Sequence, residues 1–318
     1  MVFESIIPQE LAAALTTLGR LMPMTARRAA EALEVILAQW HSSCDGSHRG
    51  RLTGDGFPVE LVFSSFDNAI RYTCEVGGPG MAPKERLESV RNLLSMLGKP
   101  ASFPLHRLQE SSAELHWGAW LGGRHTRTAD RYKVYVEAPE ELVLVARNEL
   151  ADALGDYRTL LQSHAYTLRI VAFEPDAERL EFYFRGRLLH PKELADLLRF
   201  SGLAQHEEDL FCLLEETSRQ PSRVRLPGAQ HGFSLSLAAG GKIETFTFFV
   251  FARSLFGTDL ATRSALLSLA AQHRWNLEHY SAVSAELEAP ARRGPSHGMV
   301  SFIVRKSDLP SISIGLRP

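Results

Sequence analysis

The chain has 318 residues, of which 45% are hydrophobic and 23% charged, ordinary values for a globular protein with a sizeable core. Its 35 lysines and arginines nearly balance 37 aspartates and glutamates, and the formal net charge of -2 argues against partnership with nucleic acid or an anionic membrane. No run of about 18 apolar residues suggests a membrane span, and the three scattered cysteines, Cys44, Cys74 and Cys212, suit reduced thiols in a cytoplasmic protein.

The first part of the chain predicts two helices and a hairpin. Apolar spacing of period 3.6 predicts helices over residues 11–21 and 26–40, with Thr25 capping the second. Period-2 alternation then predicts strands over residues 58–66 and 69–76, which are joined by a tight turn.

The same alternation of signals continues to the end of the chain. Four more hairpins are predicted, pairing residues 113–121 with 132–137, 166–173 with 179–185, 233–237 with 243–251, and 298–305 with 311–316. Helices are predicted between the hairpins, at residues 83–97, 140–161, 191–200, 207–219, 260–273 and 275–286.

Five hairpins recur at intervals of about 55–65 residues, which is the sequence signature of a repeated architecture. Ten antiparallel strands can close into a barrel with helices outside, which leaves no free sheet edge. We therefore predict an α+β fold in which residues 1–318 form a single barrel domain. An open α+β sheet or two half-barrels would fit the same elements.

In such a barrel the apolar strand residues face the helices and the polar ones face the lumen. The polar residues expected in the lumen are Glu60, Arg71, His116, Lys133, Tyr135, Arg169, Arg179, Glu181, Tyr183 and Arg305. The fourth hairpin is ambiguous, because either Phe246 with Phe248 or Phe249 with Phe251 could face inward. Converging cations need anions, which are either the neighbouring carboxylates or a polyanionic ligand such as a diphosphate ester. In an open sheet they would be ordinary solvated residues.

Several segments resemble one enzyme family. They are PVELVFS, AIRYTCEV, WLGGRHTRTADRYKVYVEAP and RLEFYF, and they resemble the indole prenyltransferases of the dimethylallyltryptophan synthase type and their smaller bacterial relatives, some of which prenylate peptides. The resemblance implies the prenyltransferase (ABBA) barrel. It also implies transfer of a dimethylallyl or longer group from an allylic diphosphate to an electron-rich aromatic ring, most simply an indole.

The resemblance also implies roles for the lumen residues. Glu60 would accept a hydrogen bond from the indole N–H, and His116 would remove the ring proton. The diphosphate would be held by Arg71, Lys133, Arg179, Arg169 and Arg305. The allylic cation would be shielded by Tyr135, Tyr183 and Phe248.

Two departures from the family leave the cofactor open. Glu181 stands where fungal members carry a second basic residue, and Phe246, Phe248 and Ser313 stand where tyrosines are expected. Glu181 would either bridge a Mg2+ ion to the diphosphate or pair with Arg179. No organic cofactor is expected.

Two rival functions remain on the same barrel. One is transfer to a phenol or to a residue of a cyclic peptide. The other is non-catalytic binding of an isoprenoid.

Overall fold

The ten strands of the protein form one closed antiparallel barrel, in a computed structural model that describes residues 6–41, 50–100, 114–138, 166–186, 188–238, 241–288 and 295–318. The strands are β1 Val59–Ser64, β2 Ile70–Glu75, β3 Ala119–His125, β4 Asp130–Glu137, β5 Thr167–Glu174, β6 Arg179–Arg185, β7 His231–Leu237, β8 Ile243–Phe251, β9 His297–Arg305 and β10 Asp308–Leu316. Each strand pairs with its sequence neighbours, and β1 pairs with β10 to close the ring. The predicted five-hairpin barrel is confirmed, and the open sheet is excluded.

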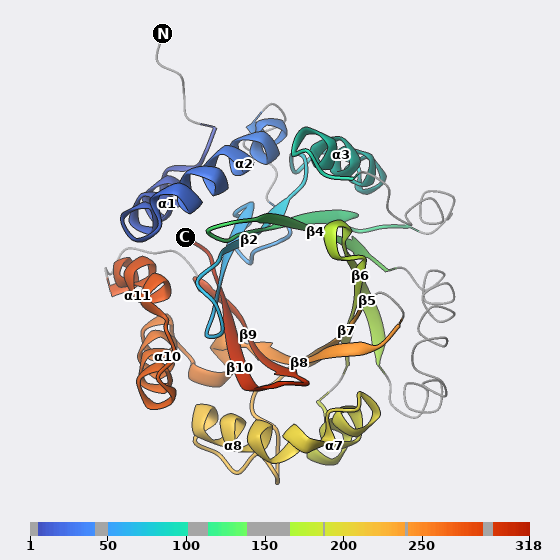
Figure 1. Cartoon of the computed structure of the whole chain (residues 1–318), viewed down its shortest axis with the longest axis vertical. Helices are drawn as coiled ribbons and strands as arrows, with labels where there is room; N and C mark the ends of the chain where they lie inside the picture. The colour runs from blue at the N-terminus through green and yellow to red at the C-terminus, as the bar shows by residue number, and fades with distance from the viewer. Residues whose placement is uncertain are drawn as a thin grey trace.

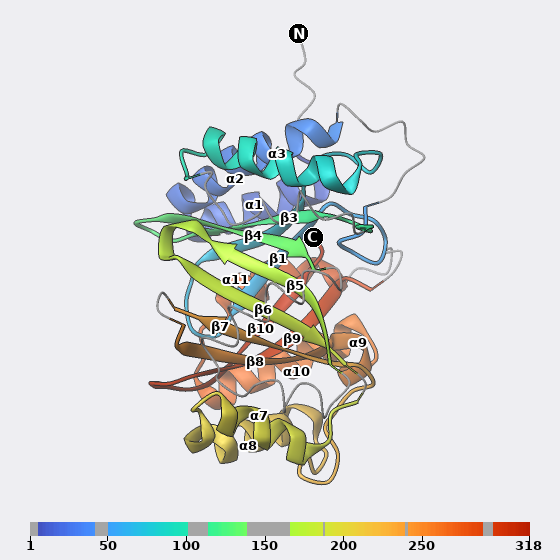
Figure 2. The same ribbon diagram turned by 90° about the vertical axis from the view of Figure 1, so that its right-hand side faces the viewer.

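Helices surround the barrel wall on its outer side (Figure 1). In chain order they are α1 Gln9–Leu21, α2 Pro23–His41, α3 Pro83–Met96, α7 Pro191–Phe200, α8 Glu207–Ser218, α9 Ala252–Phe256, α10 Asp259–His273 and α11 Glu278–Ser284. The side view shows α1, α2 and α3 over one side of the barrel and α7 and α8 over the opposite side (Figure 2). Among the described residues, no helix has both the length and the hydrophobicity to cross a bilayer. The helix predicted at residues 140–161 and the residues around Cys44 lie outside the described part.

One predicted helix start is wrong. The second helix begins at Pro23, where a proline fits because the first turn needs no N–H partner. Thr25 therefore lies inside the first turn and is buried, so it does not cap the helix.

The core lies between the outer face of the barrel and the helices. Val59, Leu61 and Phe63 alternate along β1 and are all buried, while Glu60 and Val62 between them are partly exposed toward the lumen. Because successive side chains of a strand point to opposite faces, this alternation leaves a row of polar residues inside the barrel.

The second hairpin is shifted from its predicted position. Its first strand runs over Ala119–His125, and a turn at residues 126–129 replaces the long loop expected before Tyr132. The strand contains two glycines, Gly122 and Gly123, although glycine has a low propensity for strands. They are needed, since a side chain at Gly122 would meet the Tyr135 ring at 3.0 Å and one at Gly123 would overlap the Tyr72 ring.

The third and fourth hairpins show where Arg169 lies and which phenylalanine of β8 faces the lumen. A register shift between Leu168 and Ile170 leaves Arg169 outside the β5–β6 ladder, and its side chain is exposed. In β8, Phe248 pairs with Phe233 and Phe302 and is fully buried on the outer side, so Phe249 occupies the lumen register.

Candidate active site

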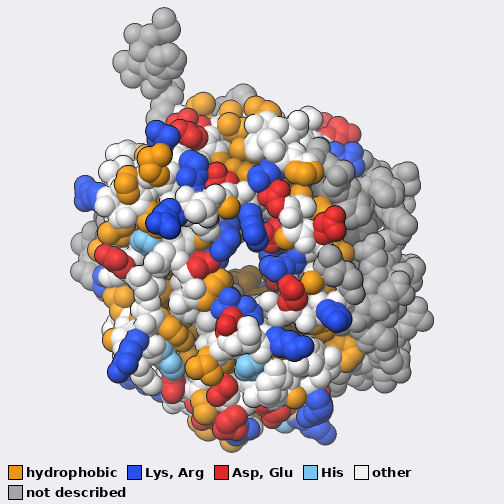
Figure 3. Space-filling view, in the orientation of Figure 1, with side chains coloured by type: hydrophobic (Ala, Val, Ile, Leu, Met, Phe, Trp, Pro, Cys, Tyr) orange, Lys and Arg blue, Asp and Glu red, His pale blue; other side chains and the backbone are white. Residues whose placement is uncertain are grey.

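The cations of the barrel gather at one mouth. All five hairpin turns lie at the same end, and six basic residues stand on the strands close to it: Arg71, Arg124, Arg131, Lys133, Arg179 and Arg305. Viewed along the barrel, lysine and arginine side chains surround a central opening with carboxylates between them (Figure 3). A mouth of this kind can bind a polyanion by charge-assisted hydrogen bonds.

Arg71 is held by the turn of the first hairpin. Its guanidinium bonds both carboxylate oxygens of Asp67 and donates to Ser64 Oγ at 2.6 Å, and Arg124 shares Asp67 at 2.9 Å. Burial opposes ionisation of Asp67, but the hydrogen bonds from Arg71 and Arg124 and the charge of Arg71 outweigh it and hold its pKa well below the usual range. Both arginines therefore remain paired across the neutral pH range.

Lys133 forms a largely buried ion pair with Glu181 in the lumen. Its Nζ lies 2.5 Å from Glu181 Oε2, and Ser234 donates to Glu181 Oε1 at 2.6 Å. Burial disfavours both charges, yet their mutual attraction raises the pKa of Lys133 and lowers that of Glu181. The predicted partner of Glu181, Arg179, bonds instead to Glu244 at 2.8 Å.

Glu181, the residue expected to bridge a magnesium ion to the diphosphate, is held by two other side chains. Among the described residues there is no group of three or more histidines, cysteines, aspartates or glutamates that could hold a metal ion. Both oxygens of Glu181 are already engaged, one by Lys133 and one by Ser234.

The counterions nearly match the cations at this mouth. The six basic residues share five carboxylates, which are Asp67, Glu174, Glu181, Glu244 and Asp308. A ligand with two or three negative charges would therefore compete with carboxylates for the same donors.

A layer of aromatic rings crosses the lumen beside the cations. The centroids of Tyr135 and Tyr183 are 5.9 Å apart, and those of Tyr183 and Phe249 are 6.3 Å apart. Lys133 Nζ lies 5.7 Å from the centroid of Tyr135. Ring faces of this kind stabilise a carbocation and exclude water from it.

Glu60 lies near the start of β1, at the end of the strand away from the hairpin turn. Its carboxylate lies against Gly298 and Gly315, where any side chain would overlap it. Burial raises the pKa of Glu60 to about 7, and no cation in the described part of the chain opposes that rise. A carboxylate of this kind is a strong hydrogen-bond acceptor that titrates near neutral pH.

Three predicted positions need correction. His116 lies in a bend before β3 and is exposed, because Glu137 Oε2 accepts the backbone N–H groups of His116, Trp117 and Gly118 and fixes this bend outside the strand. Arg169 is exposed and lies near the start of β5, at the end of the strand away from the hairpin turn, so it does not join the cations at the mouth. Phe248 faces the helices, so it cannot shield a cation in the lumen.

Sequence reasoning missed two residues of the lumen, Arg124 and Arg131, and it left the facing of Phe249 open. Trp120 pairs with Tyr135 in the lumen register and stacks on Trp117 at 3.9 Å between ring centroids. Continuing the period-2 alternation through the two glycines would have placed Arg124 in the lumen.

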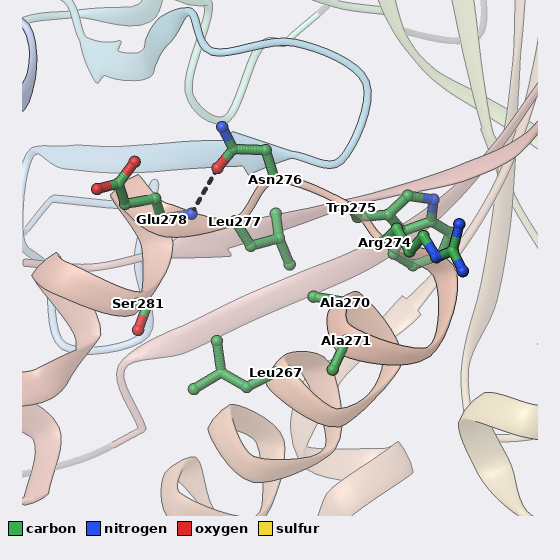
Figure 4. A pocket seen from close by; sticks show the side chains of 9 residues that line it. All are labelled: Leu267, Ala270, Ala271, Arg274, Trp275, Asn276, Leu277, Glu278 and Ser281. Atoms are coloured by element: carbon green, nitrogen blue, oxygen red, sulfur yellow. Dashed lines mark hydrogen bonds between the residues drawn. The ribbon is translucent and has the colours of Figure 1, made fainter.

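A second hollow lies outside the barrel, where α10 is followed by α11 (Figure 4). It has a volume of about 450 Å³ and is lined by Leu267, Ala270, Ala271, Arg274, Trp275, Asn276, Leu277, Glu278 and Ser281. None of the predicted site residues borders it, so the candidate site is the barrel lumen.

Solved structures share the barrel over nearly its whole length. The 6-dimethylallyltryptophan synthase from Micromonospora olivasterospora, in complex with DMASPP and Trp, superposes with a TM-score of 0.73 at 16% identity, covering 97% of this chain and 96% of that one. The 5-dimethylallyltryptophan synthase from Streptomyces coelicolor, also with DMASPP and Trp, gives 0.72 at 18% identity, covering 96% and 93%. AnaPT from Neosartorya fischeri gives 0.72 at 13% identity, covering 96% and 91%.

The fold is the aromatic prenyltransferase barrel. The expected resemblance is thus confirmed at the level of fold. No protein-family model matches the sequence, and no curated protein matches it. The prenyltransferase barrel is therefore preserved here although few residues are shared with its structural neighbours.

Proposed function

We propose that this protein is an aromatic prenyltransferase that moves a dimethylallyl or longer group from an allylic diphosphate to an electron-rich aromatic acceptor. An indole, such as that of tryptophan, is the acceptor we favour. The observation that carries the proposal is the order of groups in one lumen, with cations at one mouth, aromatic rings next to them and Glu60 beyond. Structural neighbours bound to DMASPP and Trp support it.

The cations would act on the donor. Arg71, Lys133 and Arg179 would bind the diphosphate, with Arg124, Arg131 and Arg305 around them. When the C–O bond breaks, the diphosphate leaves with the electron pair, and preorganised positive charge stabilises it. Tyr135, Tyr183 and Phe249 would flank the allylic cation and keep water from it.

Glu60 would act on the acceptor. Its carboxylate would accept the indole N–H, which raises the electron density of the ring as a ring carbon forms the new C–C bond. The ring proton must then leave to restore aromaticity, and Glu60, whose pKa is about 7, is suited to accept it. The exposed position of His116 makes it the weaker choice for this step.

Mass spectrometry of the purified protein with dimethylallyl diphosphate tests the proposal directly. The acceptors are tryptophan, a phenol and a cyclic Trp-containing peptide, each with and without Mg2+. We expect a product heavier by one prenyl group with tryptophan. Product formed only with the phenol or only with the peptide would show that this compound, and not tryptophan, is the acceptor. Binding of the diphosphate without its consumption would indicate a non-catalytic isoprenoid-binding protein.

A further inference from the structure

Tyr72, His125 and Asp130 form a chain of hydrogen bonds on the outer face of the barrel. The Tyr72 hydroxyl lies 3.0 Å from His125 Nε2, and His125 Nδ1 lies 2.8 Å from Asp130 Oδ1. Because a carboxylate can only accept, Nδ1 carries a ring proton; burial lowers the pKa of His125, so Nε2 of the neutral ring accepts from the tyrosine. Tyr72 and His125 are buried. This chain, here called the outer relay, links three neighbouring strands, β2, β3 and β4.

Each member of the outer relay is next in sequence to a lumen arginine. The adjacent pairs are Arg71 with Tyr72, Arg124 with His125, and Arg131 with Asp130. The strand register sets Arg71 opposite Arg124 and Arg124 opposite Arg131, so the three form a row across the wall. Since neighbouring residues of a strand point to opposite faces, the relay lies directly behind this arginine row.

The arginine row needs support because like charges opposite one another on adjacent strands repel. Asp67 offsets Arg71 and Arg124, and Glu174 lies 3.5 Å from Arg131. These contacts are to the side chains alone. The outer relay instead links, through hydrogen bonds between side chains, the residues that are adjacent to these arginines in the three strands.

Residues next to the outer relay hold both of its ends in place. Arg28 of α2 bonds both oxygens of Asp130 at 3.0 Å, and it also donates to the carbonyl of Thr126 in the turn. Gly123 leaves room for the tyrosine, since a Cβ there would lie 2.5 Å from the Tyr72 hydroxyl oxygen. The helical layer is thereby coupled to the wall behind the arginine row.

The protein contains a second relay of the same chemistry. The Tyr280 hydroxyl lies 2.8 Å from His297 Nε2, and His297 Nδ1 lies 2.7 Å from Asp259 Oδ1. This relay joins α10 and α11 to the start of β9. The residue that follows His297 is Gly298, which carries no charge. The second relay therefore serves as a control that has no arginine row in front of it.

We propose that Tyr72, His125 and Asp130 are positioning residues that hold the arginine row in the geometry that binds a diphosphate. The identity of this ligand rests on the proposed function. With the Tyr72 hydroxyl removed, the His125 ring loses one of its two fixed partners. The three strands then hold their arginines less firmly, and a bound diphosphate must order them.

The test compares Tyr72→Phe with Tyr280→Phe. Each variant removes one buried tyrosine hydroxyl that is hydrogen-bonded to a histidine, so both should lower the melting temperature. NMR spectra of the arginine side-chain Nε–H groups report the order of the arginine row, and calorimetry reports binding of inorganic pyrophosphate. We expect Tyr72→Phe to broaden or shift the resonances of Arg71, Arg124 and Arg131 and to weaken pyrophosphate binding about tenfold. Tyr280→Phe should change neither.

Equal effects of the two variants on the arginine resonances, or no effect of Tyr72→Phe, would overturn the proposal. If the wild-type protein binds no pyrophosphate, the donor site of the proposed function fails, while the resonances still decide whether the outer relay orders the row. Should Tyr72→Phe fail to fold, the partly exposed Arg28→Gln, which releases Asp130 from α2, takes its place. Unchanged arginine resonances in that variant would then contradict the proposal.

Discussion

A Cβ atom on Gly315 would lie 2.5 Å from Cδ of Glu60, so the glycine at the end of the barrel's last strand sets the position of the carboxylate on its first. Gly315 pairs with Val62, two residues beyond Glu60 on β1. The clash would involve only the end of a flexible side chain. A small substitution at Gly315 should therefore displace the carboxylate and leave the barrel intact.

We predict that Gly315→Ala lowers prenyl transfer at least tenfold with little loss of stability, because a displacement of about 1 Å at a reacting group is costly. Transfer is measured by product formation, and stability by thermal unfolding. The matched control is Gly80→Ala, where an added Cβ would have no neighbour within 4 Å. If Gly315→Ala and Gly80→Ala were equally active, the position of Glu60 would not matter to the reaction.

Glu60→Gln keeps the shape of the side chain and removes its charge. We expect transfer to an indole to fall about 100-fold or more, since a positioned acid or base typically contributes this much. Binding of inorganic pyrophosphate, measured by calorimetry, should remain close to that of the wild type. Loss of pyrophosphate binding together with transfer would instead assign Glu60 to the diphosphate site or to the fold.

The raised pKa of Glu60 also predicts how stability depends on pH. Folding raises this pKa from 4.5 to about 7, so the folded state holds the proton more tightly than the unfolded state. The associated stabilisation is complete below pH 4.5 and is lost as the pH rises through 7. The free energy of unfolding of Glu60→Gln minus that of the wild type should therefore be larger at pH 8 than at pH 4.5, by up to about 3 kcal/mol. Solvent in the lumen lowers this ceiling.

Denaturant unfolding of both proteins across this pH range measures the difference. In the wild type, kcat/KM should rise with pH through about 7, because transfer requires the ionised carboxylate. A stability difference that does not change with pH would show that Glu60 titrates normally.

The Lys133–Glu181 pair predicts opposite effects from its two members. Lys133→Met removes a charge-assisted donor and should weaken pyrophosphate binding roughly 10- to 100-fold. Glu181→Gln removes the carboxylate that competes for Lys133 and should strengthen it. Calorimetry with and without Mg2+ measures both variants. Weaker binding by Glu181→Gln only when Mg2+ is present would instead favour a metal-bridging role.

The aromatic layer predicts a change in product distribution. Tyr183→Leu should raise the hydrolysis of dimethylallyl diphosphate relative to transfer, because the ring that faces both Tyr135 and Phe249 would be gone. Chromatography of the prenyl alcohol and the prenylated acceptor gives the ratio. Phe248→Leu is the control, since Phe248 lies on the outer side of the same wall. An equal rise in both variants would point to general loosening of the barrel.

The fold was predictable because two periodicities alternate five times along the chain, and four of the five hairpins lie close to their predicted positions. The second was misplaced because Gly122 and Gly123 have low strand propensity, although each is required by a tyrosine ring packed over it. Arg169 was misassigned for a different reason. It lies beside a register shift near the start of β5, at the end of the strand away from the mouth, and no feature of the local sequence marks this shift.

The sequence predicted which side chains point into the lumen better than it predicted which of them form ion pairs with one another. Glu60, Arg71, Lys133 and Tyr183 occupy lumen positions as expected. That Glu181 pairs with Lys133 and Arg179 with Glu244 follows from the tilt of the strands, which brings together residues on different rows. Phe248 could not be separated from Phe249, because both faces of β8 carry aromatic residues.

Closure of the barrel between β1 and β10 also has a consequence for folding. Ser65 and Ile312 bond to each other across this seam in both directions, although 247 positions separate them in the sequence. Contacts of such long range form slowly, because the entropy of ordering the intervening chain is lost before they form. Glu60 is among the first lumen residues to leave the ribosome, yet its pocket is completed only when the last strand arrives. A partly synthesised chain would hold an unpaired β1 edge, where aggregation is the competing outcome.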